Sequence, residues 1–370
     1  MRLRHPILRC AIACAVGTIF LSTAQPAAAS TVVADDAIPR TESGRPDLTG
    51  TYDAATLTPL VRPREFGDKL FLTPEEAERI AAEERAYLAE RNKASDGDRE
   101  APPEGGDGST GAAGNVGGYN AFWVDRGSGA FSVDGKFRTS ILVDPPDGQM
   151  PEMTPQARRA RAERYAAYRR GNDGVAYWVE EGGPDAPGPY DDMEQRPHAE
   201  RCLLGFIGAT PTFPGLYNNF KRIVQTEDHV MILVEMNHDA RVVRMNSEHA
   251  PPEIRTWLGD SIGWWEGDTL VVDSTNFLPG TQGRGGSENL HVVERFTLQP
   301  GGDLLYRFTV EDPTVWTEPW TGEYLWRASD EKVFEYACHE GNYALGNIMR
   351  GARLMEADAA AEYAAGDSDD

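Results

Sequence analysis

The sequence predicts a mainly β protein, folded as an antiparallel up-and-down barrel or a strongly curled sheet, with two helical insertions in its N-terminal half. From about residue 217 onward, apolar runs recur every 8–12 residues between compact turn signals. Within 304–311 the side chains alternate, with Leu304, Tyr306, Phe308 and Val310 on one face. Many consecutive strands favour closure into a barrel, because closure leaves no exposed edge. A two-sheet sandwich is the alternative.

The predicted strands of this region are separated by acidic or glycine-containing turns. They cover residues 220–226, 229–236, 240–245, 261–266, 268–275, 290–298, 303–311, 320–328 and 332–338. The last of them is expected to lead into an acidic tail over 356–370, frayed at the chain end.

The N-terminal half carries the remaining elements. A flexible leader over 30–46 precedes a short strand at 47–52, and a capping box with proline at the first helical position opens a helix over 73–92. Residues 96–118 are rich in glycine, aspartate and proline and predict a flexible loop. A strand at 139–143 and a very basic helix over 155–170 follow, so that 47–355 form a single β-rich domain.

The first 29 residues have the pattern of a secretory signal. Arg2, Arg4 and Arg9 precede an apolar stretch that is short for a membrane span, and three alanines end at Ala29. An uncleaved anchor is the alternative. No later segment reaches 18 apolar residues, so we expect a periplasmic or secreted protein with no integral membrane segment after signal removal.

The charge is strongly acidic. The chain has a net charge of −23, and removal of the signal takes away three arginines and no acid, which brings it to −26. Such a surface repels phosphate backbones and anionic lipids, so nucleic-acid and membrane-surface roles are disfavoured. A small-molecule substrate or ligand is the expected partner.

Two cysteines remain after the signal, Cys202 and Cys338. An even pair in an oxidising compartment predicts one disulfide, although two separately buried thiols would also fit. No P-loop, Rossmann glycine pattern, nucleophile elbow or zinc-protease motif is present in the sequence. Nucleotide and flavin cofactors are therefore not expected, whereas a metal stays possible.

Candidate chemistry is concentrated in three histidine–carboxylate segments of the β region. A histidine beside a carboxylate can act as a general base of fixed tautomer, and several such groups can hold a metal. For each histidine, a structural role in a strand or turn is the alternative. The candidate acids, bases or ligands are His238, Asp239, His291, Glu294, His339 and Glu340.

Aromatic and basic residues near these segments are candidates for ligand binding. Six of the eight tryptophans fall between 257 and 326. Tryptophan in a β domain first suggests core, but beside polar groups it can stack on a ligand. The candidate binding residues are Arg241, Arg295, Trp265, Trp316, Trp320, Asn342 and Tyr343.

Three stretches together resemble a family of exported bacterial proteins of uncharacterised function. They are Ser140–Gly148 (SILVDPPDG), Trp264–Val272 (WWEGDTLVV), and the run from Glu288 (ENLHVVERF) to Tyr343 (YACHEGNY). This resemblance implies export and brings no activity with it. A second resemblance is to lipocalin-type barrels, whose first strand carries Gly-x-Trp. Here Gly50-Thr51-Tyr52 has tyrosine in place of tryptophan.

Three functional hypotheses follow. The first is an extracytoplasmic enzyme that acts on a small organic substrate by general acid–base chemistry in a β-barrel pocket, as a lyase, isomerase or hydrolase. The second is a non-catalytic, lipocalin-like protein that binds small molecules, and the third is a structural partner of the cell envelope.

Overall fold

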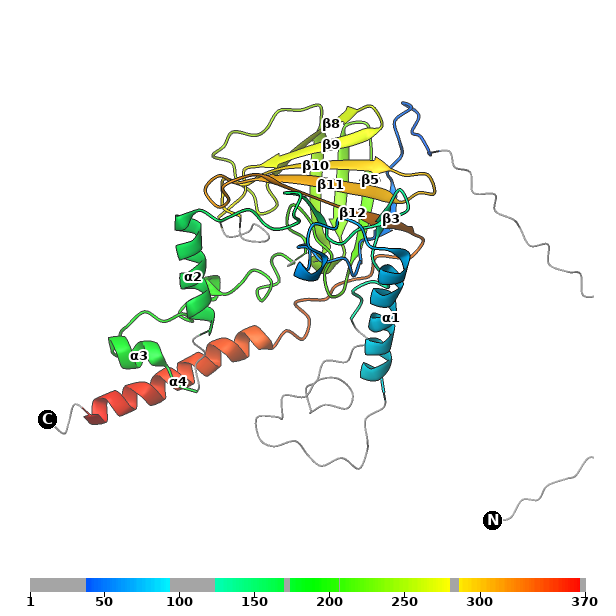
Figure 1. Cartoon of the computed structure of the whole chain (residues 1–370). Coiled ribbons are helices and arrows are strands. Elements are labelled where there is room, and N and C mark those ends of the chain that lie inside the picture. Colours follow the sequence, from blue (N-terminus) through cyan, green and yellow to red (C-terminus); the bar gives the residue numbers. More distant parts are fainter. Residues whose placement is uncertain (1–37, 94–123, 170–173, 206, 280–285, 367–370) are drawn as a thin grey trace, which may run out of the picture. The chain divides into compact units, whose positions relative to one another are not determined.

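The computed structural model describes residues 38–93, 124–169, 174–205, 207–279 and 286–366 (Figure 1). The predicted signal over 1–29 and the predicted flexible loop over 96–118 lie outside these residues. Twelve strands occur in the described part of the chain. They are β1 (Gly50–Asp53), β2 (Ser132–Val133), β3 (Lys136–Phe137), β4 (Leu142–Asp144), β5 (Phe220–Gln225), β6 (His229–Val234), β7 (Asp239–Met245), β8 (Asp260–Glu266), β9 (Thr269–Thr275), β10 (His291–Leu298), β11 (Leu304–Glu311) and β12 (Trp320–Ser329).

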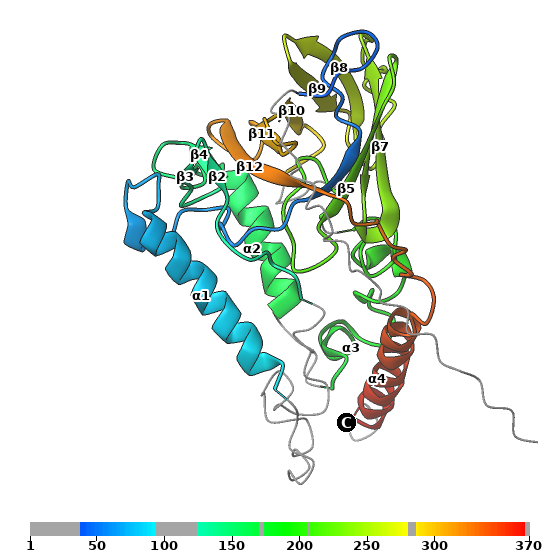
Figure 2. The ribbon, with the colours of Figure 1, turned by 90° about the vertical axis from the view of Figure 1, so that its right-hand side faces the viewer.

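Nine of these strands form a closed barrel, in the order β1-β5-β6-β7-β8-β9-β10-β11-β12, with β1 pairing back onto β12. The two views show the sheet curling until β5 lies near β12 (Figures 1 and 2). β4 adds to β12 beyond the closure point, and β2 and β3 form a separate hairpin. The prediction of a mainly β barrel is confirmed.

The barrel is mixed rather than purely antiparallel, which corrects the prediction. β7 and β8 are parallel, with Val243 opposite Ser261 and Met245 opposite Gly263. The reason is the connection between them: residues 246–259 carry the chain back along β7, so that β8 begins beside the middle of β7 and runs in the same direction, whereas an antiparallel pair would need only a short turn.

The predicted last strand, 332–338, is also absent. Residues 330–337 have no regular structure and lead to a turn. β12 already pairs with β11, β1 and β4, so no backbone edge is left at which a further strand could bond.

Four α-helices lie outside the barrel within the described ranges: α1 (Pro74–Arg91), α2 (Pro155–Arg169), α3 (Tyr177–Gly182) and α4 (Ala344–Gly366). Thr73 closes the capping box of α1 with Glu76. α4 occupies most of the region where we expected an acidic tail. Its alanine-rich sequence favours a helix, and Ala352 and Ala359 pack against Trp178 of α3.

Side chains fill the barrel interior. Residues at alternate positions of β9 to β12 point inward, and Phe296, Tyr306, Phe308, Tyr324 and Trp326 have no exposed surface. Their rings lie 4.8–5.7 Å from neighbouring ring centres, as in the pair formed by Tyr306 and Trp326. This core stabilises the barrel and occupies the space in which a lipocalin would hold a ligand.

The segment before β5 closes one end of the barrel. The backbone N–H of Thr212 donates to Tyr306 Oη at 3.3 Å, and Tyr324 Oη donates to the Thr212 carbonyl at 2.9 Å. Phe213 packs edge-on against Phe308. The disulfide between Cys202 and Cys338, predicted from the cysteine count, links the start of this segment to the chain after β12.

Candidate functional site

The predicted histidine–carboxylate segments lie in different surroundings. His238 is in a turn between β6 and β7, where its Nε2 accepts a hydrogen bond from the Tyr336 N–H at 3.2 Å. Asp239, the next residue, points into the barrel end, and its carboxylate accepts from the Gly205 N–H at 2.8 Å. His238 and Asp239 therefore point in different directions and do not face the same ligand.

Asp239 has a buried cation beside it, Lys221 on β5. Burial raises the pKa of Asp239 to about 6, and burial lowers the pKa of Lys221 to about 7. The ammonium of Lys221 is fully enclosed and has no hydrogen-bond partner among the residues that the structure describes. Such a lysine suits proton transfer in principle, but no solvent path to it is evident, because its side chain has no exposed surface.

Glu294 lies inside the barrel, on the opposite face of β10 from His291. Arg241 donates hydrogen bonds to both carboxylate oxygens of Glu294, and Tyr306 Oη donates to Glu294 Oε1 at 2.7 Å. Burial and the adjacent carboxylate raise the pKa of Tyr306 well above its usual value. Glu294 and Arg241 satisfy each other within the core, so we assign them a structural role in place of the catalytic and binding roles considered above.

The segment around His339 is exposed. His339 and Glu340 lie in the turn that precedes α4, and Tyr343 is 78% exposed. Asn342 Nδ2 donates to the carbonyl of Glu200 at 3.4 Å, beside the disulfide. Glu340 and Asn342 line a surface pocket of about 430 Å³ next to the disulfide.

The remaining candidate binding residues divide between core and surface. Arg295 pairs with Glu266 on the barrel exterior at 2.7 Å, and Trp265 is half-buried against the core. Trp320 is buried, with its ring centre 5.7 Å from that of Trp316. Of these four, only Trp316 lines a groove, described below.

His291 belongs to a chain of ionisable groups on the outer wall of the barrel. Its Nε2 lies 3.0 Å from Asp273 Oδ2 on β9, and its Nδ1 lies 3.3 Å from Glu311 Oε2 on β11. The hydrogen bond to Asp273 is the main cause that raises the pKa of His291, and Glu311 adds to it. His291 thus has one nitrogen firmly held and one that faces an exposed carboxylate.

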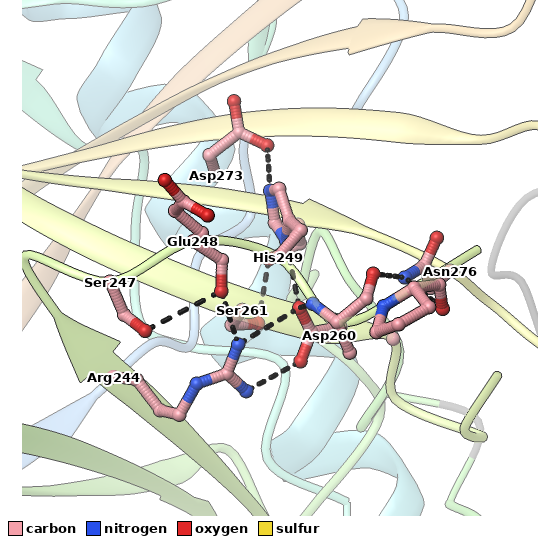
Figure 3. Close-up of polar contacts among 12 residues, drawn as sticks. Arg244, Ser247, Glu248, His249, Asp260, Ser261, Asp273 and Asn276 are labelled. Atoms are coloured by element: carbon pink, nitrogen blue, oxygen red, sulfur yellow. Dashed lines mark hydrogen bonds and ion pairs between the residues drawn. The ribbon is translucent and has the colours of Figure 1, made fainter. Parts of the chain in front are cut away.

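The chain continues from Asp273 to His249, as Figure 3 shows. His249 bridges two carboxylates, with Nε2 3.0 Å from Asp273 Oδ1 and Nδ1 2.8 Å from Asp260 Oδ2. Asp260 also accepts from Arg244 at 2.6 Å and from the Ala250 N–H at 3.0 Å. Partial burial alone would raise the pKa of Asp260, but these hydrogen bonds bring it down to about 2.

Sequence reasoning missed five members of this group: Arg244, His249, Asp260, Asp273 and Glu311. A signal for Asp273 was present, because in an alternating strand it points to the same side as the outward residues of β10. The strand register that sets His291 directly opposite Glu311 was not predicted. His249 and Asp260 come together through the connection that makes β7 and β8 parallel.

A groove of about 1000 Å³ lies beside the strand ends that carry His291 and Glu311. One side is the segment 286–289, which leads into β10, and another is 314–316, which follows β11. The start of α2 forms a further side, tied to the 314–316 segment by the bond from Thr154 N–H to the Val315 carbonyl at 2.8 Å. The groove is outside the barrel, whose interior is filled.

In the described part of the chain, no group of three or more His, Cys, Asp or Glu side chains is arranged to hold a metal ion. Over the same residues, no helix has both the length and the apolar character needed to cross a membrane. Comparison with protein-family models, curated proteins and solved structures found no match.

Proposed function

We propose that the protein is an extracytoplasmic enzyme that acts on a small organic molecule by general acid–base chemistry, with His291, two residues after the groove-lining Asn289, as the proton-transferring group. The observation that carries the proposal is the unequal bonding of the His291 ring. Asp273 holds Nε2, whereas Nδ1 has only a 3.3 Å contact to Glu311, whose side chain is half exposed.

This arrangement meets the requirements for acid–base catalysis. A base must be oriented by a third group, and Asp273 fixes the ring while His249 and Asp260 fix Asp273. The hydrogen bonds to Asp273 and Glu311 raise the pKa of His291 and so favour its protonated form, from which Nδ1–H can donate a proton to a leaving group or a carbonyl oxygen and recover it later. Elimination, isomerisation and hydrolysis all use such a step.

The groove supplies a binding surface formed by the segments that adjoin the strands of His291 and Glu311. The loops that leave the His291 and Glu311 strand ends are the same loops that line the groove. Its apolar lining includes Trp316, Met153 and Leu60, which suits a partly apolar substrate. The export proposal is supported by the basic and apolar N-terminal sequence and by the disulfide.

Non-catalytic binding is the second candidate. The filled interior argues against a ligand inside the barrel, in the manner of a lipocalin. In this second candidate, the apolar groove binds a ligand and releases it unchanged. The chain of ionisable groups that includes His249 and His291 then serves only to link five strands of the barrel. Turnover distinguishes the two candidates, because only the enzyme converts the bound molecule into a product.

The experiment is a mass-spectrometric screen for turnover of pooled esters, lactones, hydroxy acids and unsaturated acids. Any conversion found is repeated with His291→Gln and with His229→Gln, an exposed histidine on β6, as the matched control. We expect His291→Gln to lower the rate by about 10²–10⁴-fold, with the control unchanged. Equal rates for wild type and His291→Gln would refute the assignment, and a ligand recovered unchanged from every pool would favour the binding protein.

A further inference from the structure

The floor of the groove is apolar and continuous with the core. Val315 and Trp316 are each 5% exposed, and Leu60 and Met153 pack against the same core cluster. The Trp316 ring stands edge-on to Trp320, which fixes its position. A flat apolar body, such as an aromatic ring, would find a rigid surface here.

Among the described residues, one cation lines this groove, Arg161 on α2. Its only contact within the described residues is a 3.7 Å approach of Nη1 to Met153 Sδ, so its guanidinium has no carboxylate partner there. This is unusual in a chain with 59 acidic and 36 basic residues. Glu288 is the acidic residue on the groove lining, and its carbonyl, rather than its carboxylate, is engaged by Arg255.

A second arginine, Arg62, follows two residues after the groove-lining Leu60. Arg62 is 1% exposed, and its Nε and Nη2 have no hydrogen-bond partner in the described structure. Its backbone carbonyl accepts from the Gln149 side chain, next to the groove residue Met150. A buried guanidinium with unmade hydrogen bonds raises the positive potential around it, because no carboxylate neutralises it.

We propose that the groove selects small organic anions, with the apolar body against Trp316 and a carboxylate or sulfonate head on Arg161. This inference rests on the proposed function, since it names the substrate class of that groove. Arg158 lies three residues before Arg161 and therefore on the same side of α2, so this side of the helix carries two positive charges in an otherwise acidic protein.

Two fluorescent probes of similar shape test the inference. 8-Anilinonaphthalene-1-sulfonate carries an anionic head, and N-phenyl-1-naphthylamine lacks it. Binding of each is measured by fluorescence titration of the purified full-length protein. The variants are Arg161→Gln, the matched control Arg159→Gln on the same exposed helix, and Ala160→Trp, which fills the groove from an exposed position.

We expect the sulfonate to bind more tightly than the neutral probe. Arg161→Gln should weaken the sulfonate by about tenfold and the neutral probe by less than about twofold, because only the charged hydrogen bond is lost. Arg159→Gln should change neither, and added salt should weaken the sulfonate alone. Ala160→Trp should abolish the binding of both.

Two results would overturn the inference, and they are distinguishable. If Ala160→Trp abolishes binding but Arg161→Gln leaves sulfonate affinity unchanged, the groove binds ligands without selecting anions, and the proposed function survives. If Ala160→Trp affects neither probe, the groove is not a binding site, and the proposed function loses its substrate surface as well.

Discussion

Replacing Asp260 by asparagine tests how much the chain of ionisable groups on the outer wall of the barrel contributes to the stability of the protein. The carboxylate is 8% exposed and accepts hydrogen bonds from Arg244, His249 and the Ala250 N–H. Asparagine keeps the shape but cannot carry the charge, so it loses the favourable interactions of the ionised form. The expected result is a loss of stability whose size follows from the pKa.

The magnitude comes from the difference between the folded pKa of about 2 and the ordinary value of 3.8. Each pKa unit corresponds to about 1.4 kcal/mol, so ionised Asp260 contributes about 2.4 kcal/mol at pH 7. Because the folded pKa is depressed, this contribution is present above pH 3.8 and is lost as the pH falls through about 2. At pH 3, roughly half of it, about 1.3 kcal/mol, should remain.

The assay is urea unfolding followed by tryptophan fluorescence, with the disulfide intact, for wild type and Asp260→Asn at pH 7 and pH 3. Asp268→Asn is the control, because Asp268 forms a similar ion pair with Arg40 while its side chain is 50% exposed. We expect the control to change stability little at either pH. A difference between wild type and Asp260→Asn that is the same at pH 7 and pH 3 would refute the reasoning.

Three further predictions concern the barrel and its closure. Glu294→Gln should lower the free energy of unfolding by about 3–5 kcal/mol, measured by urea unfolding, because it leaves Arg241 charged and unpaired in the core. Gly208→Ala should cost about 1–3 kcal/mol, because the added Cβ would lie 1.9 Å from Asp239 Oδ2, whereas Gly346→Ala, with nothing within 4 Å, should be neutral or slightly stabilising by thermal melting. Reducing the disulfide, which closes a loop of 136 residues, should lower stability by up to about 5 kcal/mol, and an unchanged melting temperature in dithiothreitol would contradict this.

Patterns of neighbouring residues in the sequence were sufficient to predict much of the fold. The strict alternation of β11 and the capping box at Thr73 are properties of a few neighbouring residues, so both could be predicted from the chain alone. The cysteine count likewise indicated the pairing of Cys202 with Cys338. The barrel itself followed from the number and spacing of the strands.

What the sequence by itself determined was therefore the position of most of the barrel strands, which of their faces are apolar and which cysteines pair, whereas the strand expected over 332–338 does not form. Only the tertiary structure decided how strands far apart in the sequence align. This alignment determines which ionisable side chains meet at the candidate site. The crossover that makes β7 and β8 parallel brings His249 to Asp260, and the register of β9 to β11 brings Asp273 and Glu311 to His291. The physical reason is that a strand pattern specifies which side a residue faces, whereas its partner across the sheet depends on register and closure, which are properties of the whole barrel.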